Sequence, residues 1–373
     1  MEVLTVPERT VAKIKKENLI HNLNILKSKL AQNCRLMAVV KADAYGHGAV
    51  ECAKTLAENG VKHFAVATFN EAVELRIGGI KGDILIFCEP QPDETAIASS
   101  LNIISTVFSS EKAEQLNEFT KGSIRVHIKI DTGMSRAGIY CHTRDDVEAA
   151  AAEVARIHQC KKLSIEGIYT HFSSADDITS DVTDSQFTAF NALLGKLKQM
   201  SIPTGIRHIC ASSGILYYPQ YHLDMVRAGI ALYGYSPKPG DEYSQLFKPV
   251  MQLEAHIVHI TKLKPYDCVS YGRAYTSACD MKVATVTIGY GDGYNRSLSN
   301  VDYMLVGGKK APICGRVCMD ITVIDVTDID CKIGDTAIVF GEAKPADIIA
   351  KKLNTISYEV LCNIGKRFKR TYQ

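Results

Sequence analysis

The chain has 373 residues, of which 46% are hydrophobic and 23% are charged, and its formal net charge is +2. This balance is that of an ordinary globular protein, and it argues against nucleic acid or an anionic membrane surface as a partner. No signal peptide and no apolar run long enough to cross a bilayer occurs, so we expect a cytoplasmic protein without membrane contact within this chain. A cytoplasmic domain of a longer membrane protein stays open.

Twelve cysteines are scattered singly along the chain, and no Cys-x-x-Cys motif occurs. Many have apolar neighbours in the sequence, as small core residues do. The spacing predicts neither a zinc site nor a disulfide framework. We therefore expect a reducing compartment and no bound metal.

From about residue 10 to 235, short β-branched apolar runs alternate with longer segments of helical period. The predicted strands are 36–41, 64–68, 84–87, 103–108, 124–131, 165–171, 206–211 and 225–232. The predicted helices between them include 49–58, 70–77, 111–117, 145–157 and 183–200. These units favour an α/β fold of the (β/α)8, TIM-like barrel type, although a doubly wound sheet would produce the same alternation.

The pattern changes after residues 235–240, where two prolines and a glycine interrupt the chain. Beyond this point we predict strands at 251–260, 282–288, 321–326 and 336–340, and one helix at 346–353. The predicted organisation is a barrel over residues 1–240 and a mostly β C-terminal domain over residues 241–373.

A short apolar run ends in Lys41 and leads into a turn of small residues with one tyrosine, Tyr45. Desolvation of an ammonium group at the end of a buried strand favours its neutral, nucleophilic form. Such a lysine can form a Schiff base with a carbonyl cofactor such as pyridoxal phosphate. Taken alone, the segment is explained equally well by a surface lysine that caps a core strand.

Polar residues also mark four other predicted barrel strands. Residues 129–136 close the fifth strand, His171 ends the sixth, serines 212 and 213 follow the seventh, and Arg227 lies in the eighth. Barrel enzymes place their sites at the carboxyl ends of the strands, so this coincidence predicts a single site. Taken singly, the serines also suit a helix N-cap and His171 a core position, whereas a guanidinium in an apolar strand needs an acceptor.

Seven segments, taken together and in this order, resemble the alanine racemase family, the barrel-plus-β-domain class of pyridoxal phosphate enzymes. They are 38–48, 131–136, 166–172, 225–230, 269–272, 315–320 and 354–360, and the resemblance runs over almost the whole chain. It implies an enzyme that interconverts L- and D-alanine and supplies D-amino acid for peptidoglycan, with serine left open as a second substrate. It also implies a homodimer with shared active sites.

The resemblance further implies the roles of individual residues. Lys41 would be the Schiff-base lysine and the base on one face of the substrate, and Tyr271 of the partner subunit would be the opposite base. The other cofactor-binding positions would be Tyr45, His171, Ser213, Arg227, Gly229, Ile230 and Tyr358. Arg136 and the Met319 N–H group would hold the substrate carboxylate, and Lys129, often carbamylated in the family, would orient Arg136.

Two positions depart from the family's pattern: Ser212 replaces a usual asparagine, and Gly214 replaces a usual alanine. These changes resemble the serine racemases of glycopeptide (vancomycin) resistance systems, whose catalytic domain follows a membrane portion. Tyr358, in contrast, is the alanine-type residue at the substrate gate. Two other classes stay open: a pyridoxal phosphate decarboxylase, which needs a carboxylate in place of Arg227, and a non-enzymatic pyridoxal phosphate carrier, which lacks the β domain.

Overall fold

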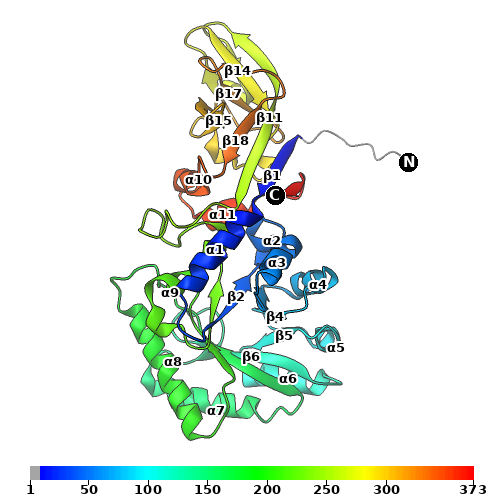
Figure 1. Ribbon diagram of the computed structural model, residues 1–373, viewed down its shortest axis with the longest axis vertical. Helices are drawn as coiled ribbons and strands as arrows, with labels where there is room; N and C mark the ends of the chain where they lie inside the picture. Colours follow the sequence, from blue (N-terminus) through cyan, green and yellow to red (C-terminus); the bar gives the residue numbers. More distant parts are fainter. Residues whose placement is uncertain (1–8) are drawn as a thin grey trace, which may run out of the picture. The chain divides into compact units, whose positions relative to one another are not determined.

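The computed structural model describes residues 9–373, which form two compact units (Figure 1). The barrel unit comprises Ile20–Ala44 and Ala49–Phe247. The β unit comprises the described residues up to Leu19, the short segment Tyr45–Gly48, and Lys248–Gln373. No helix within residues 9–373 is long and apolar enough to span a bilayer.

The barrel unit is built on a closed parallel sheet. Its strands pair in the order β2-β3-β4-β5-β6-β8-β9-β10, and β10 pairs with β2 to complete the circle. The short strand β7 (Ile139–Tyr140) adds to β6. Since a closed circle leaves no sheet edge, the predicted barrel is confirmed and the doubly wound alternative is excluded. The eight strands are β2 (Arg35–Val39), β3 (His63–Val66), β4 (Asp83–Ile86), β5 (Ile104–Val107), β6 (Ile124–Asp131), β8 (Leu163–Tyr169), β9 (Ile206–His208) and β10 (Met225–Ala228).

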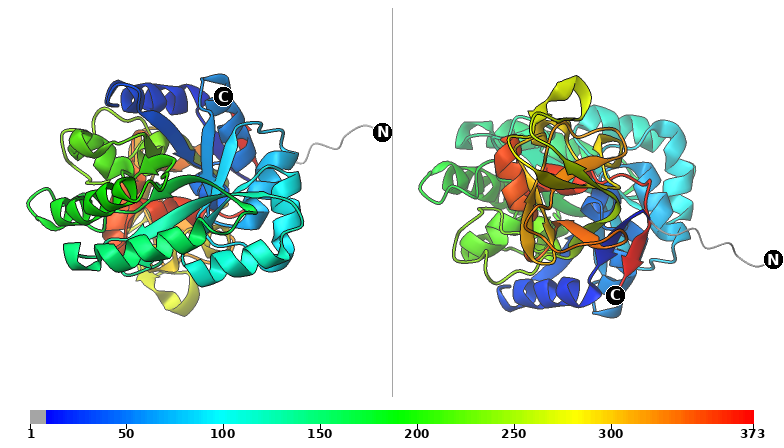
Figure 2. Two further views of the ribbon diagram at one scale, coloured as in Figure 1. Left: turned by 90° about the horizontal axis from the view of Figure 1, so that it is seen from below. Right: turned by 90° about the horizontal axis from the view of Figure 1, so that it is seen from above.

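Helices alternate with these strands and surround them (Figure 2). Each buries an apolar face, as α7 does with Val147, Ala151 and Val154 at helical spacing. Helices α1 and α5 are absent from the predicted helices, and α9 is indicated only by serines 212 and 213 at its start. Both α5 and α9 have only six residues and show little periodicity. The helices are α1 (Lys16–Ser28), α3 (Ala49–Glu58), α4 (Phe69–Ile77), α5 (Thr95–Ser100), α6 (Ser110–Phe119), α7 (Val147–Ile157), α8 (Val182–Gln199) and α9 (Ser212–Tyr217).

The β unit is a mostly antiparallel sheet around β11 (Met251–Leu263), which pairs with β1, β14 and β18. The predicted strands correspond to β11, β14, β17 and β18, and the predicted helix is α10 (Ala346–Leu353). A second helix, α11 (Ser357–Cys362), follows it. The other strands are β1 (Thr10–Ile14), β12 (Cys268–Val269), β13 (Tyr275–Thr276), β14 (Met281–Val286), β15 (Tyr303–Val306), β16 (Lys309–Pro312), β17 (Thr322–Asp325), β18 (Thr336–Phe340) and β19 (Arg370–Tyr372).

Strand β1 joins this sheet from the opposite end of the sequence. Ala12 pairs with Leu253 of β11 in antiparallel register and with Arg370 of β19 in parallel register. The sequence-based division at residue 240 does not anticipate this arrangement. Strands so distant along the chain leave no local signal of their pairing.

One ion pair of the β unit is fully buried. The Nζ atom of Lys344 lies 2.7 Å from Oδ2 of Asp302, and neither side chain has exposed surface. Asp302 also accepts hydrogen bonds from Lys352 and from the hydroxyl of Tyr294. Because Asp302 directly precedes β15 and Lys344 lies just before α10, the pair fixes both elements. Removal of one partner of such a pair costs about 3–5 kcal/mol.

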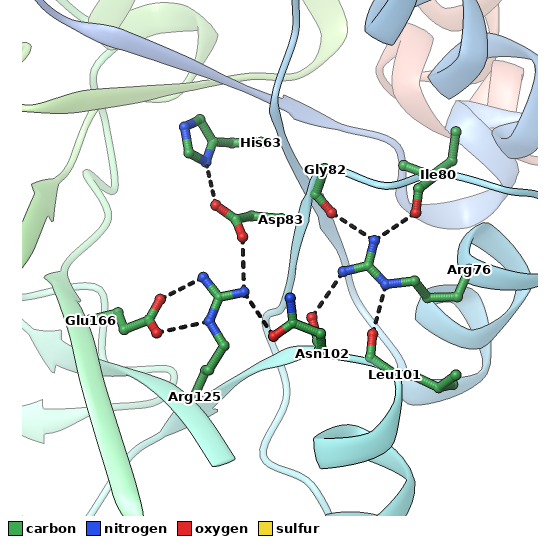
Figure 3. A network of polar contacts seen from close by, with 9 residues as sticks. All are labelled: His63, Arg76, Ile80, Gly82, Asp83, Leu101, Asn102, Arg125 and Glu166. Atoms are coloured by element: carbon green, nitrogen blue, oxygen red, sulfur yellow. Dashed lines mark hydrogen bonds and ion pairs between the residues drawn. The ribbon is translucent and has the colours of Figure 1, made fainter. Parts of the chain in front are cut away.

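A network of charged side chains lies at the amino ends of the barrel strands (Figure 3). Arg125 of β6 contacts Asp83 of β4 at 2.8 Å and Glu166 of β8 at 2.6 Å. Asp83 also contacts Nδ1 of His63 at 3.1 Å. The hydrogen bond from His63 and the contact with Arg125 lower the pKa of the Asp83 carboxyl below its ordinary value. The network therefore ties together strands that do not all neighbour one another.

Replacement of Arg125 by Met should lower the free energy of unfolding by about 1–2 kcal/mol, after allowance for solvent screening, because Asp83 and Glu166 lose their shared cation. Since the folded-state pKa of Asp83 is lowered, this stabilisation is complete above the ordinary carboxyl pKa of 3.8 and is lost as the pH falls below it. Urea unfolding at several pH values measures both effects. Arg156→Met, which removes the exposed contact with Glu111, is the control and should have a smaller effect. An equal effect of both variants would contradict the account.

Candidate active site

Lys41 lies two residues after the end of β2 and begins a left-handed turn. The four residues that follow it have φ angles between 51° and 54°: Ala42, Asp43, Ala44 and Tyr45. Left-handed backbone costs roughly 1–2 kcal/mol at each non-glycine residue, so other contacts must hold it. Within the barrel unit, Glu71 accepts a hydrogen bond from the amide of Ala42 at 2.6 Å, and Asp43 accepts one from the amide of Ala49 at 2.8 Å. These contacts set the position at which the Lys41 side chain leaves the backbone.

Arg227 of β10 is buried, and its terminal nitrogens are surrounded by acceptors. Nη1 lies 2.9 Å from Nδ1 of His208. Nη2 lies 2.9 Å from Nδ1 of His171 and donates to the carbonyl oxygens of Thr170 and Ile209 at the same distance. These acceptors come from the carboxyl ends of β8 and β9, so closure of the barrel brings them to β10.

The two histidines act as acceptors because they are neutral. Burial and the Arg227 charge keep the pKa of both His171 and His208 well below the ordinary value. With Nδ1 of His208 as acceptor, its proton resides on Nε2, which lies 2.9 Å from Nδ1 of His127. Burial lowers the pKa of His127 to about 3, so this imidazole is neutral as well. Burial also lowers the pKa of Arg227 to about 10, which leaves the guanidinium charged at neutral pH.

The ring of Tyr169 forms a platform under these groups. It stacks on the ring of His208, with the centroids 4.7 Å apart and an interplanar angle of 8°. Arg227 and Lys129 lie over the Tyr169 ring at 5.3 Å and 5.2 Å from its centroid. The hydroxyl of Tyr169 lies 3.1 Å from that of Thr106, and this contact fixes the ring.

Sequence reasoning did not include Tyr169, His208, His127 or Thr106 in the site. One signal was available: in residues 124–131, apolar residues alternate with Arg125, His127, Lys129 and Asp131. Alternate residues of a strand face the same side, so this run places polar groups on one face of β6. The sequence contains no comparable indication for Tyr169 or His208, which lie in mixed apolar segments.

Lys129 and Asp131 occupy the end of β6. Burial, together with the Arg227 and Arg136 charges, lowers the pKa of the Lys129 amine to about 7. Asp131 Oδ1 accepts hydrogen bonds at 3.0 Å from three successive amides of the following turn, those of Gly133, Met134 and Ser135. The Asp131 carboxylate thus fixes the turn that leads to Arg136.

Ser212 links the start of α9 to the loop after β10. Its hydroxyl accepts hydrogen bonds from the amide of Gly229 at 3.0 Å and from that of Ala231 at 3.4 Å. Ser213 and Ile230, two predicted cofactor-binding residues, are the direct neighbours of these groups. The serine that departs from the family pattern therefore has a local role, which is to hold the backbone of this loop.

The remaining predicted site residues belong to the β unit. Tyr45 is buried, burial raises the pKa of its phenol well above the ordinary value, and its ring centroid lies 6.0 Å from that of Tyr358. A Cβ atom at Gly46 would meet the carbonyl oxygen of Leu361 at 2.3 Å, so only glycine permits this approach to α11. Tyr271 and Met319, in contrast, are 72% and 53% exposed.

The barrel site carries a surplus of positive charge. Arg227, Lys129, Arg136 and Lys41 all act in the same direction on the pKa of His171. The nearby carboxylate of Asp131 is occupied by amide groups. Such a donor set suits a ligand with several negative charges. A closed barrel with a lysine and clustered cations at the carboxyl ends of its strands, joined to a β unit, defines a barrel enzyme for small anionic molecules.

Comparison with known proteins narrows this class. Models of the alanine racemase N-terminal and C-terminal domains match residues 14–237 and 250–372. The alanine racemase of Halothermothrix orenii is 40% identical over 372 residues, covering 98% of this chain and 97% of that protein. The chain belongs to the alanine racemase family and is an enzyme of that family.

Solved structures support the same assignment. An alanine racemase structure from Clostridium difficile 630 has a TM-score of 0.93 and 38% identity, covering 100% of this chain and 97% of that chain. A Bacillus anthracis alanine racemase with bound L-Ala-P has a TM-score of 0.91 and 30% identity, covering 99% and 96% of the two chains.

The low pKa of Lys129 can be measured directly. In protein labelled with ¹³C at lysine Cε, one lysine signal should titrate near pH 7, because the Lys129 amine is buried among other cations. Lys129→Arg should remove this signal and leave the others in place. The measurement is made in CO₂-free buffer. Titration of the Lys129 signal near the ordinary value of 10.5 would contradict the electrostatic account.

Proposed function

We propose that the protein is a pyridoxal phosphate-dependent racemase that interconverts L- and D-alanine and supplies D-alanine for peptidoglycan. The observation that carries the proposal is the cation cluster around buried Arg227, with Lys41 at the end of β2. A cofactor with a phosphate group, a carbonyl group and a ring nitrogen matches this set: a lysine to bind the carbonyl, hydroxyl and amide groups for the phosphate, and a guanidinium for the ring. The family's activity supports the same conclusion.

The residues present would hold the cofactor at three places. Lys41 would bind it covalently. Its phosphate would contact Tyr45, Ser213, Gly229, Ile230 and Tyr358. Arg227 would face the ring nitrogen through Nε–H, since its hydrogen bonds within residues 9–373 use Nη1 and Nη2. When bound, the cofactor supplies an electron sink for the carbanion that α-proton removal leaves.

Arg227 decides which reaction this chemistry favours. Burial lowers its pKa only to about 10, so at neutral pH it remains charged and offers a hydrogen bond rather than a proton. A carboxylic acid in its place would readily protonate the ring nitrogen, which suits decarboxylation. His171 and His208 beside it are neutral, so neither is an acid that could protonate the ring nitrogen. This arrangement favours a racemase over the decarboxylase alternative, and the β unit argues against a simple carrier.

Racemisation requires a base on each face of the substrate's α-carbon. Lys41 Nζ takes or returns the proton on one face. The Tyr271 hydroxyl of the partner subunit does so on the other face, in a homodimer whose subunits share their sites. The 72% exposure of Tyr271 and the 53% exposure of Met319 are consistent with residues that serve a second subunit. Arg136 and the Met319 amide hold the substrate carboxylate.

Lys129 is suited to carbamylation. A neutral amine attacks CO₂ to form an N-carboxylate and releases one proton, and a pKa of about 7 leaves much of this amine neutral. The new negative charge would offset the repulsion between Lys129 and Arg136. Disappearance of the titrating Lys129 signal on addition of bicarbonate would support this modification, and its persistence would exclude it.

We expect kcat/KM for L-alanine to exceed that for L-serine by about a hundredfold, or about 2.7 kcal/mol of barrier, measured side by side on cofactor-saturated protein. Comparable values would make the protein a serine/alanine racemase of the glycopeptide-resistance type. Turnover of neither amino acid by protein with bound cofactor would contradict the proposed function.

Replacement of Tyr271 by Phe should slow racemisation at least about 100-fold, equally in both directions, because one of the two bases is lost. In D₂O one enantiomer should still exchange its α-hydrogen, since Lys41 remains. NMR of both enantiomers reads exchange and racemisation separately. Tyr266→Phe, at another exposed tyrosine of the β unit, is the control. Unchanged racemisation in Tyr271→Phe would remove Tyr271 from the mechanism.

A further inference from the structure

Gln186 of α8 is a buried amide that contacts the loop after β8. Only 2% of this residue is exposed. Its Nε2 group donates to the carbonyl oxygen of His171 at 3.2 Å. Its Oε1 atom accepts from the amide of Ser173 at 2.9 Å and from the Ser173 hydroxyl at 3.1 Å. The Gln186 amide thus binds both an acceptor, the His171 carbonyl, and donors, the amide and hydroxyl of Ser173, in residues 171–173.

The segment held by Gln186 supplies two of the contacts of Arg227. Nη2 of Arg227 donates to the carbonyl of Thr170 and lies 2.9 Å from Nδ1 of His171. A shift of residues 170–173 would therefore move both partners at once. Among the described residues, the hydrogen bonds of Gln186 are to His171 and Ser173 and not to Arg227, so we expect any effect on the guanidinium to pass through this loop.

Gln186 also lies against the turn that carries Arg136. A Cβ atom built on Gly133 would stand 3.6 Å from Cγ of Gln186. The hydroxyls of Thr132 and Thr170, 2.8 Å apart, join the same two loops. Gln186 therefore lies between two segments: the loop after β8, which contacts Arg227, and the turn that carries Arg136.

We propose that Gln186 is a positioning residue, which sets the loop after β8 so that His171 and Arg227 meet the cofactor ring in the correct place. The proposal rests on the proposed pyridoxal phosphate-dependent function. It requires the amide to donate and accept at once, because the His171 carbonyl needs a donor and the Ser173 amide needs an acceptor. A carboxylic acid fulfils both requirements only while it is protonated.

The test compares Gln186→Glu and Gln186→Met with the original protein, as holoenzyme. Readouts are the dissociation constant of pyridoxal phosphate, from its absorbance on binding, and kcat and KM for L-alanine across a pH series. Gln186→Met should weaken cofactor binding roughly tenfold at every pH, a loss usual for residues that orient ligand-contacting groups. Gln186→Glu should approach the original protein at low pH and fall behind it as the carboxyl ionises. Gln199→Met, at an exposed glutamine of the same helix, should change neither quantity.

Because ionisation of a buried carboxyl also lowers stability, thermal unfolding is followed over the same pH series to separate positioning from general stability. Weaker cofactor binding by Gln186→Glu that does not change progressively with pH, or that occurs only where the variant begins to unfold, would overturn the proposal. Unchanged cofactor binding in Gln186→Met would overturn it as well. If the Gln186 variants do not fold, Ser173→Ala, which removes one of the three hydrogen bonds, should weaken binding about threefold, and no change there would overturn it. Failure of the original protein to bind pyridoxal phosphate would instead overturn the proposed function.

Discussion

Arg227 is a permanently charged group inside a barrel, and a buried cation is tolerated only when acceptors surround it. Its acceptors are two main-chain carbonyl oxygens and two imidazole nitrogens, and within residues 9–373 no carboxylate is among its hydrogen-bond partners. The charge is thus dispersed over neutral dipoles rather than cancelled. This choice has a functional consequence, because an uncancelled positive charge remains available to an anionic or electron-rich ligand.

The need of buried Arg227 for acceptors is met only in the closed barrel. The acceptors of Arg227 belong to the ends of β8 and β9, and the strand of Arg227 itself also pairs with β2, which leads to Lys41. Lys129 and the Tyr169 platform complete the surroundings. Repulsion among these cations opposes folding. Burial and this repulsion lower the pKa of the Lys129 amine. The network of Arg125, Asp83 and Glu166 at the amino ends of the strands stabilises the barrel. It offsets part of the free energy that the cation repulsion costs, at the opposite ends of the strands from the candidate active site.

Much of the architecture could be predicted from local patterns. The apolar runs of the parallel strands are nearly continuous, and reactive residues such as Lys41 and His171 stand where these runs end, so strands and strand-end residues were accessible from the sequence. The pairing of β1 with β19 was not, because it joins the two ends of the chain. Tyr169, His208 and Gln186 were missed for a related reason, because their roles depend on contacts between elements. Tyr169 and His208 end β8 and β9, but the sequence does not show that one ring stacks on the other or that His208 accepts from Arg227.

The most direct test of this account is the protonation state of His208. In protein with ¹⁵N-labelled histidine, assigned with a His208→Gln variant, we expect His208 to remain neutral from about pH 5 to about pH 8, with its proton on Nε2 and Nδ1 free of a proton. That tautomer is required if Nδ1 accepts a hydrogen bond from Arg227. A His208 that gains a charge near the ordinary pKa of 6.5, or that carries its proton on Nδ1, would contradict the account.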